Sequence, residues 1–192
     1  MEERAVIELR YGGGTQSAAL PATWRTTWIR TAPPPAERSE SFITEEALDA
    51  PVGAPPLRAF LAGARTLTVV VSDKTRRCRT DLFLPLLLRR VHAAGILPKD
   101  VTILFATGTH PAQTAGERRE LLGEEIVREY RVLEHDCRDD AALVSVGDTR
   151  DGTPVRVHRA LSDADRIIGA GAIVHHYFAG FGGGPPMPGG VR

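Results

Sequence analysis

The chain has 192 residues, with 24 Lys and Arg balanced by 24 Asp and Glu, so its formal net charge at pH 7 is zero. This balance leaves no basic field for nucleic acid and no polybasic patch for a membrane surface. The longest apolar run, near residues 82–88, is too short to cross a bilayer. The N-terminus lacks a secretory layout, and Cys78 and Cys137 form no C-x-x-C pair. We therefore expect a cytoplasmic protein with reduced thiols, and a disulfide between the two cysteines is the alternative.

The first third of the chain predicts a small appendage. Residues 5–30 are rich in β-forming side chains and broken by a glycine turn, which predicts short strands. The prolines at 33–35 then end regular structure. Thr44 precedes a run that stops at Pro51, a pattern typical of a short capped helix. We expect residues 1–62 to form a β-rich segment and linker that packs on the main domain.

From residue 63 the pattern changes to alternating strands and helices. Helices are predicted to start at a Thr80 cap and at a Thr114–Glu117 capping box, and Pro85 is expected to kink or delay the first. Asp151-Gly152 marks the turn of a hairpin. Compact apolar runs predict four strands, at 66–71, 101–107, 130–135 and 166–171. These units predict an α/β domain over 63–192, a Rossmann-like and mostly parallel sheet with helices on both faces.

Ligands of parallel sheets bind beyond the carboxyl ends of the strands, which selects the loops 72–79, 107–112 and 171–184. The first loop carries Asp73 and Arg76. An arginine at a strand end offers a planar fork for a carboxylate or phosphate, with Asp73 placed to hold it. The alternative is a solvated loop with a local ion pair.

His110 and His176 follow the second and fourth predicted strands. Imidazole changes its charge near neutral pH, so both are candidate proton-transfer groups. His110 can also be a loop histidine bonded to backbone, and residues 174–190 can be a flexible glycine-rich tail. The convergence of both histidines with Arg76 on one rim favours an anion anchor with two proton-transfer groups.

Common catalytic motifs are absent from the sequence. It contains no P-loop, no G-x-S-x-G elbow and no H-E-x-x-H zinc motif. His175 and His176 are adjacent, so in an extended segment they point to opposite sides. We therefore predict no metal site.

Several segments together resemble the nickel-pincer lactate racemases and related 2-hydroxyacid racemases and epimerases. The main ones are SDKTR at 72–76, TGTH at 107–110 and HYFAGFGGG at 176–184. PVGAPPL, YRVLEHD, GTPVRVHR and ADRIIGAG add to the likeness in the same order. The resemblance covers nearly the whole chain and corresponds to the family's N-terminal domain. We expect the family's C-terminal domain to be absent.

The resemblance implies an isomerase. In the family, a nickel-pincer nucleotide accepts a hydride from C2 of the 2-hydroxyacid while a histidine takes the hydroxyl proton. Two histidines on opposite sides then serve the two enantiomers. Carried over by motif, these are His110 and His176. Arg76, with Asp73 beside it, corresponds to the group that binds the carboxylate of a substrate such as lactate.

Pro186 occupies the position of the family's cofactor-binding lysine, and no lysine follows Lys99. Proline has no side-chain nucleophile, and the family's nickel-ligating histidine would lie beyond Arg192. Arg77 and Arg79 stand where the family often has prolines. We therefore expect an inactive N-terminal fragment that does not bind the nickel cofactor. The alternative is a cofactor-free module that binds small carboxylates.

Overall fold

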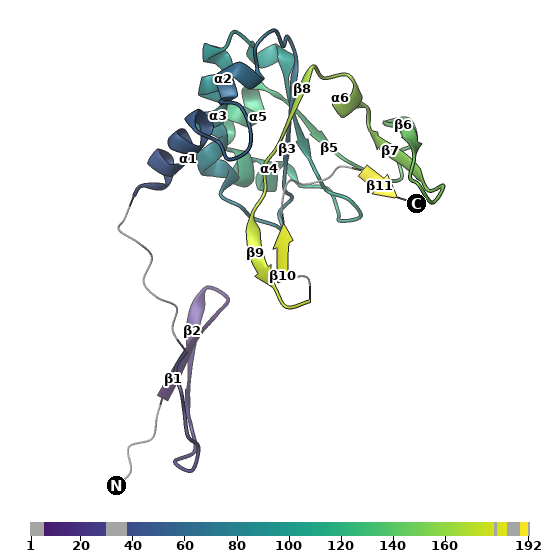
Figure 1. Ribbon diagram of the computed structural model, residues 1–192. Helices are drawn as coiled ribbons and strands as arrows, with labels where there is room; N and C mark the ends of the chain where they lie inside the picture. The colour runs from purple at the N-terminus through teal and green to yellow at the C-terminus, as the bar shows by residue number, and fades with distance from the viewer. Residues whose placement is uncertain (1–5, 30–37, 179, 184–188, 192) are drawn as a thin grey trace. The chain divides into compact units, whose positions relative to one another are not determined.

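The computed structural model describes residues 6–29, 38–178, 180–183 and 189–191 (Figure 1). The chain divides into two compact units, Met1–Glu37 and Arg38–Arg192. No helix among the described residues has the length and apolar character needed to cross a bilayer.

The described part of the first unit contains an antiparallel two-stranded ribbon. β1 (Val6–Tyr11) pairs with β2 (Gly14–Ala19), and Gly12, with a φ of +58°, lies in the turn between them. The further strands predicted up to residue 30 do not form, since residues 20–29 contain no strand. The Trp24 N–H instead donates to the Pro21 carbonyl at 2.9 Å and closes a turn. Pro21 has no N–H to offer to a ladder, which explains why the strand pattern ends there.

The second unit is built on a four-stranded parallel sheet in the order β5-β4-β3-β8. In the register, Leu67 at the start of β3 lies beside Val101 of β4 and Arg166 of β8. The four predicted strands and the α/β fold class are confirmed. The strands are β3 (Leu67–Val71), β4 (Val101–Phe105), β5 (Arg131–Glu134) and β8 (Arg166–Gly169).

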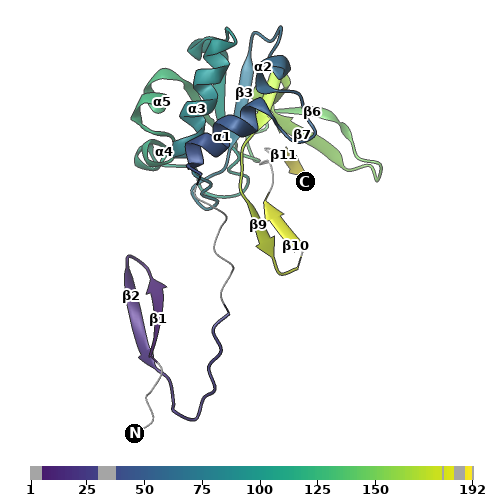
Figure 2. The same ribbon diagram turned by 60° about the vertical axis from the view of Figure 1, so that its left-hand side comes forward.

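Helices cover one face of this sheet (Figure 2). Strand side chains alternate between faces, and fully buried Val69 and Ile103 pack with Leu84 and Leu88 of α3 in one hydrophobic core. Burying each such side chain contributes on the order of 1.5–3 kcal/mol. The helices are α1 (Glu40–Asp49), α2 (Leu57–Phe60), α3 (Thr80–Ala93), α4 (Ala115–Leu122) and α5 (Glu124–Glu129), with a 3-10 turn η1 (Pro98–Asp100) before β4.

A short helix and a small antiparallel sheet meet the opposite face. The Thr68 hydroxyl of β3 donates to the Ala160 carbonyl of α6 at 2.7 Å, so the prediction of helices on both faces is confirmed. Gly152, with a φ of +77°, lies in the predicted hairpin turn. The elements are α6 (Arg159–Ser162), β6 (Leu143–Asp148), β7 (Pro154–His158) and β11 (Gly189–Val191), with β7 in the centre of the small sheet.

α1 begins earlier than the sequence predicts. Ser39 caps it by accepting from the Phe42 N–H at 3.2 Å. Thr44, the predicted cap, lies inside the helix and donates to the Glu40 carbonyl at 2.8 Å. Arg90 of α3 forms ion pairs with two carboxylates of α1, which joins α1 to the second unit.

The starts of α3 and α4 delimit the loops that follow β3 and β4. Arg79 leads into α3 with a φ of +59°, so Thr80 is the first helical residue and not the predicted cap. Pro85 lies within α3 and does not delay its start. The predicted capping box of α4 is confirmed: the Thr114 hydroxyl accepts from the Glu117 N–H at 3.2 Å, and the Glu117 carboxylate accepts from the Thr114 N–H at 2.8 Å.

Candidate functional site

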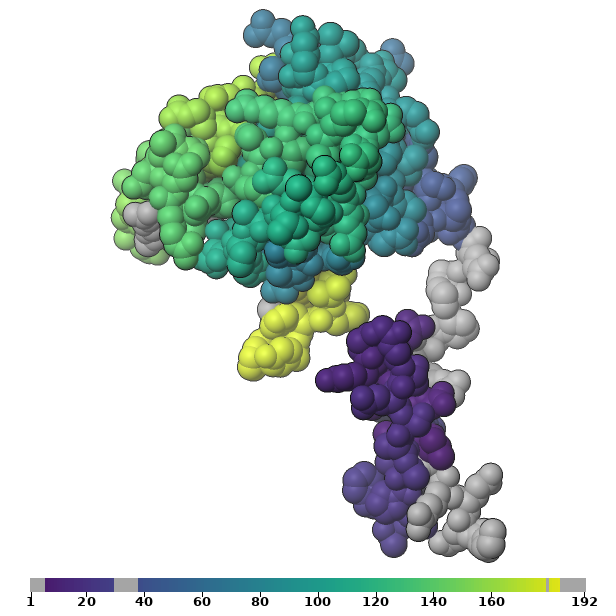
Figure 3. Space-filling model, turned by 180° about the vertical axis from the view of Figure 1, so that it is seen from behind, coloured from purple at the N-terminus to yellow at the C-terminus, as the bar shows by residue number. Residues whose placement is uncertain are grey.

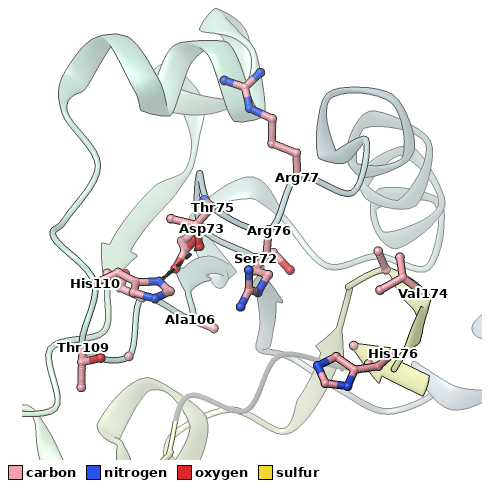
Figure 4. A pocket seen from close by; sticks show the side chains of 15 residues that line it. Ser72, Asp73, Thr75, Arg76, Arg77, Ala106, Thr109, His110, Val174 and His176 are labelled. Atoms are coloured by element: carbon pink, nitrogen blue, oxygen red, sulfur yellow. Dashed lines mark hydrogen bonds and ion pairs between the residues drawn. The ribbon is translucent and has the colours of Figure 1, made fainter. Parts of the chain in front are cut away.

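A pocket of about 810 Å³ opens at the carboxyl ends of β3 and β4 (Figure 4). The loop after β3, the loop after β4, and the hairpin of β9 (Ile173–His176) and β10 (Gly180–Gly183) contribute its lining. Figure 3 shows that this hairpin projects from the body of the second unit. All four site residues predicted from the sequence line this pocket: Asp73, Arg76, His110 and His176.

Asp73 follows β3 and is the buried centre of the first loop, with a side chain only 3% exposed. Its Oδ1 accepts from the N–H and the hydroxyl of Thr75, each at 2.7 Å, and its Oδ2 lies 2.6 Å from His110 Nδ1. Burial acts to raise the pKa of Asp73, but these hydrogen bonds together hold that pKa below its ordinary value. The ionised carboxylate is therefore directed at His110, whereas the sequence predicts it beside Arg76.

The Asp73 carboxylate selects one tautomer of His110. A carboxylate only accepts hydrogen bonds, so Nδ1 of His110 carries the proton and Nε2 of the neutral ring has the lone pair. The loop turns at Gly108, whose φ of +63° favours glycine, and the His110 N–H donates to the Thr107 carbonyl at 3.0 Å. His110 is thus prepared to accept a proton at Nε2.

Arg76 lies at the end of the turn that Asp73 starts, with its N–H donating to the Asp73 carbonyl at 3.0 Å. Figure 4 shows its guanidinium between His110 and His176. Within the described part of the chain, no group forms an ion pair or hydrogen bond with this guanidinium. By contrast, the next residue, Arg77, pairs with a glutamate of α4 at 2.7 Å. An unpaired guanidinium facing a pocket is suited to bind an anionic group.

His176 ends β9 and lies across the pocket from His110 (Figure 4). The Phe178 N–H donates to His176 Nδ1 at 3.2 Å. This bond requires a lone pair on Nδ1, so the neutral His176 ring carries its proton on Nε2. The two neutral imidazoles are therefore opposite tautomers, with the proton on Nδ1 in His110 and on Nε2 in His176.

Of two glycines in β10 beside the pocket, only Gly183 is required by the close approach of the backbones. Gly183 has a φ of +95°, and a Cβ there would lie 1.8 Å from the Ala172 carbonyl oxygen, so no other residue fits without a shift of the backbone. A Cβ at Gly182 would lie 3.4 Å from Cδ2 of His176, which is ordinary contact. The glycine-rich sequence therefore brings two backbones together beside the pocket.

Two charged residues behind the pocket were not predicted from the sequence. Lys74 Nζ lies 2.8 Å from the Glu117 carboxylate, which ties the first loop to α4. Glu134 accepts from the Thr107 hydroxyl at 3.0 Å. Glu134 ends β5 at the same edge of the sheet, so the rule for strand ends also selects it, and Lys74 lies within the SDKTR segment that carries the family resemblance.

The described residues offer little evidence on cofactor or metal binding. Pro186, at the position of the family's lysine, lies outside the described residues. Among the residues that the structure describes, no three His, Cys, Asp or Glu side chains gather in a group that could hold a metal ion.

The chain belongs to the lactate racemase N-terminal domain family, whose family model matches residues 11–187. It is 33% identical over 146 residues to the lactate racemase of Lactiplantibacillus plantarum. It is 32% identical over 146 residues to the lactate racemase of Thermoanaerobacterium thermosaccharolyticum. Each match covers 76% of this chain and 34% of the relative, so the chain spans about a third of the length of the curated relatives it matches.

Solved structures show the same likeness. The lactate racemase apoprotein from Thermoanaerobacterium thermosaccharolyticum matches 93% of this chain and 41% of its own, with a TM-score of 0.77 and 29% identity. A crystal structure of a Thermotoga maritima protein matches 73% of this chain and 35% of its own, with a TM-score of 0.57 and 25% identity. The first match extends over nearly all of the fold described above.

Proposed function

We propose that this chain supplies the carboxylate-binding and proton-transfer groups of a 2-hydroxyacid racemase, with lactate as the representative substrate. The single observation that carries the proposal is the Arg76 guanidinium, which has no partner among the described residues and lies between two imidazoles on opposite sides of one pocket. Membership of the lactate racemase N-terminal domain family supports this substrate class.

In this proposal Arg76 binds the substrate carboxylate. A bidentate, charge-assisted contact contributes on the order of 1.5–3 kcal/mol. A millimolar site requires about 4 kcal/mol, so Arg76 alone does not reach it. His110 and His176 add hydrogen bonds, but both side chains are exposed and the ligand stays hydrated. We expect millimolar or weaker affinity for lactate.

The two histidines act on the hydroxyl group of the bound acid. With the carboxylate held by Arg76, one enantiomer directs its hydroxyl to His110 and the other directs it to His176. Asp73 holds His110 with Nε2 free to accept the proton and stabilises the imidazolium that results. His176, which carries its proton on Nε2, would donate that proton to the oxygen on C2 when the hydroxyl group is formed again on the opposite side. Acid–base groups on both sides of the pocket would serve both enantiomers, and inversion at C2 would also need a hydride acceptor, which these side chains do not supply.

The chain's residues do not fit the covalent attachment of the nickel-pincer nucleotide that the resemblance implies. Pro186 stands at the position of the attaching lysine, and no lysine follows Lys99. We therefore derive no hydride-transfer step for this chain. We propose that purified residues 1–192 do not interconvert D- and L-lactate, even with added nickel cofactor. Interconversion above the rate of a heat-denatured sample would contradict this.

The second candidate is a cofactor-free module that binds a small carboxylate. Pro186 favours it, because proline removes the attachment point and leaves Arg76 unaffected. Both candidates require binding through Arg76, and they differ in turnover. Catalysis by this chain in the presence of polypeptide covering the rest of a lactate racemase would favour the racemase, whereas binding without turnover in that mixture would favour the module.

An NMR titration of the ¹⁵N-labelled chain with lactate tests the shared requirement. We expect saturable shifts around the pocket in the wild type, their loss in Arg76→Ala, and their retention in Arg77→Ala. Arg77→Ala is the matched control because it removes the same charge from the neighbouring residue, whose guanidinium is already paired with a glutamate of α4. Salt should weaken binding, since the contact is ionic. Identical saturation in wild type and Arg76→Ala would refute the assignment of Arg76.

A further inference from the structure

The His110 loop is buried at both ends and exposed in its middle. Thr107 and Gln113 are 2% and 4% exposed, although His110 between them is 43% exposed. Each lies three residues from His110 along the chain. A loop with two buried polar ends requires a buried partner for those ends, because an unsatisfied polar group in the interior is destabilising.

Glu134 is the partner of both ends. The Thr107 hydroxyl donates to its Oε2 at 3.0 Å. The Gln113 amide nitrogen, oriented as its neighbouring donors and acceptors require, donates to its Oε1 at 3.1 Å. Arg118 of α4 completes the group by donating from Nε to Oε1 at 2.9 Å. One carboxylate at the end of β5 thus binds the beginning of the loop, its end, and the helix that follows.

This carboxylate has no direct role at the pocket. Glu134 is absent from the residues that line it, and its side chain is only 13% exposed. Burial raises the pKa of Glu134, while Thr107, Arg118 and Gln113 act to lower it. A largely buried carboxylate with a raised pKa is stable as an anion only while these donors stay in place. Glu134 therefore contacts the two ends of the loop and α4, and does not line the pocket.

We propose that Glu134 is a positioning residue for His110. Glu134 binds both Thr107 and Gln113 and so fixes the distance between the two ends of the loop. From this loop His110 Nδ1 reaches Asp73 Oδ2 at 2.6 Å. Without this link the loop ends separate, the bond to Asp73 weakens, and His110 loses its fixed tautomer. The positioning of His110 by Glu134 does not depend on the proposed function. Only the use of the His110 tautomer in proton transfer rests on it.

The test is the tautomer of His110, read from imidazole ¹⁵N shifts at a pH where the ring is neutral. The wild type should show the Nδ1–H form. Glu134→Gln keeps the shape but replaces an acceptor oxygen with a donor facing Arg118, and should move most His110 rings to the Nε2–H form that free histidine prefers. Glu120→Gln is the matched control, because it neutralises an exposed glutamate of α4, and should leave His110 unchanged.

Thr107→Val provides a second variant that removes one donor and keeps the buried volume. It should shift the His110 tautomer in the same direction by a smaller amount. A folded Glu134→Gln chain whose His110 stays in the Nδ1–H form would overturn the inference. If Glu134→Gln does not fold, an unchanged tautomer in Thr107→Val overturns it and a shifted one supports it. Lactate binding through Arg76 is measured separately, so failure of the proposed function is distinguishable from failure of this one.

Discussion

Gly183→Ala should open the β9–β10 hairpin and leave the rest of the second unit folded. The φ of +95° disfavours alanine, and its Cβ would lie 1.8 Å from the Ala172 carbonyl oxygen. The left-handed conformation costs on the order of 1–2 kcal/mol, and relief of the overlap adds on the order of 1–3 kcal/mol. β9 is exposed throughout, and a two-stranded hairpin is only marginally stable. A penalty of roughly 2–5 kcal/mol therefore exceeds the local stability of the hairpin.

Cross-strand NOEs between Val174 and Gly182, which are partners in the register, report on the hairpin directly. We expect them to disappear in Gly183→Ala, with loss of His176 from its place in the pocket, while the thermal midpoint of the unit stays unchanged. Gly182→Ala is the matched control, because its Cβ makes only ordinary contact with His176. Survival of the NOEs in Gly183→Ala, or equal loss in both variants, would show that the close approach at Gly183 does not determine the hairpin.

Three further predictions concern stability in urea. Asp73→Asn should lower the free energy of unfolding by about 1.5–3 kcal/mol, since His110 and Thr75 lose a charged acceptor; an unchanged value relative to the exposed control Asp81→Asn would contradict this. Burial lowers the pKa of His135 and His158, so below about pH 6.5 the unfolded chain binds protons that the folded chain does not. Stability should therefore fall from about pH 7 to about pH 5, less steeply in His135→Leu, and equal slopes would refute the assignment. Thr114→Ala should cost about 1 kcal/mol through loss of the α4 cap, and a midpoint equal to that of Thr109→Ala would count against it.

Local patterns were sufficient to predict the sheet and the edge that carries the candidate site. The run at 67–71 is buried along its whole length, as expected for a strand covered on both faces. The capping box of α4 depends on residues three apart, so it is readable without tertiary structure. Asp73 and His110 follow parallel strands, and parallel order alone places their loops at one edge.

Contacts between distant segments could not be predicted in this way. Asp73 and His110 are 37 residues apart, and only the shape of both loops decides that the carboxylate meets the imidazole and not Arg76. Arg79 pairs with Glu40 at 2.9 Å, a contact between loop and helix that no sequence pattern indicates. The role of Glu134 likewise depends on donors from the loop after β4 and from α4, which the fold brings together.

The most direct test of the pocket follows the His110 and His176 imidazole resonances while D-lactate or L-lactate is added to the labelled chain. We expect both rings to respond, with one enantiomer shifting His110 more and the other shifting His176 more, and with both responses lost in Arg76→Ala. His175, whose ring lies against Phe181, is the internal control and should stay unshifted. Equal shifts of all three histidines, or no response to either enantiomer, would contradict a pocket that presents acid–base groups to both faces of a 2-hydroxyacid.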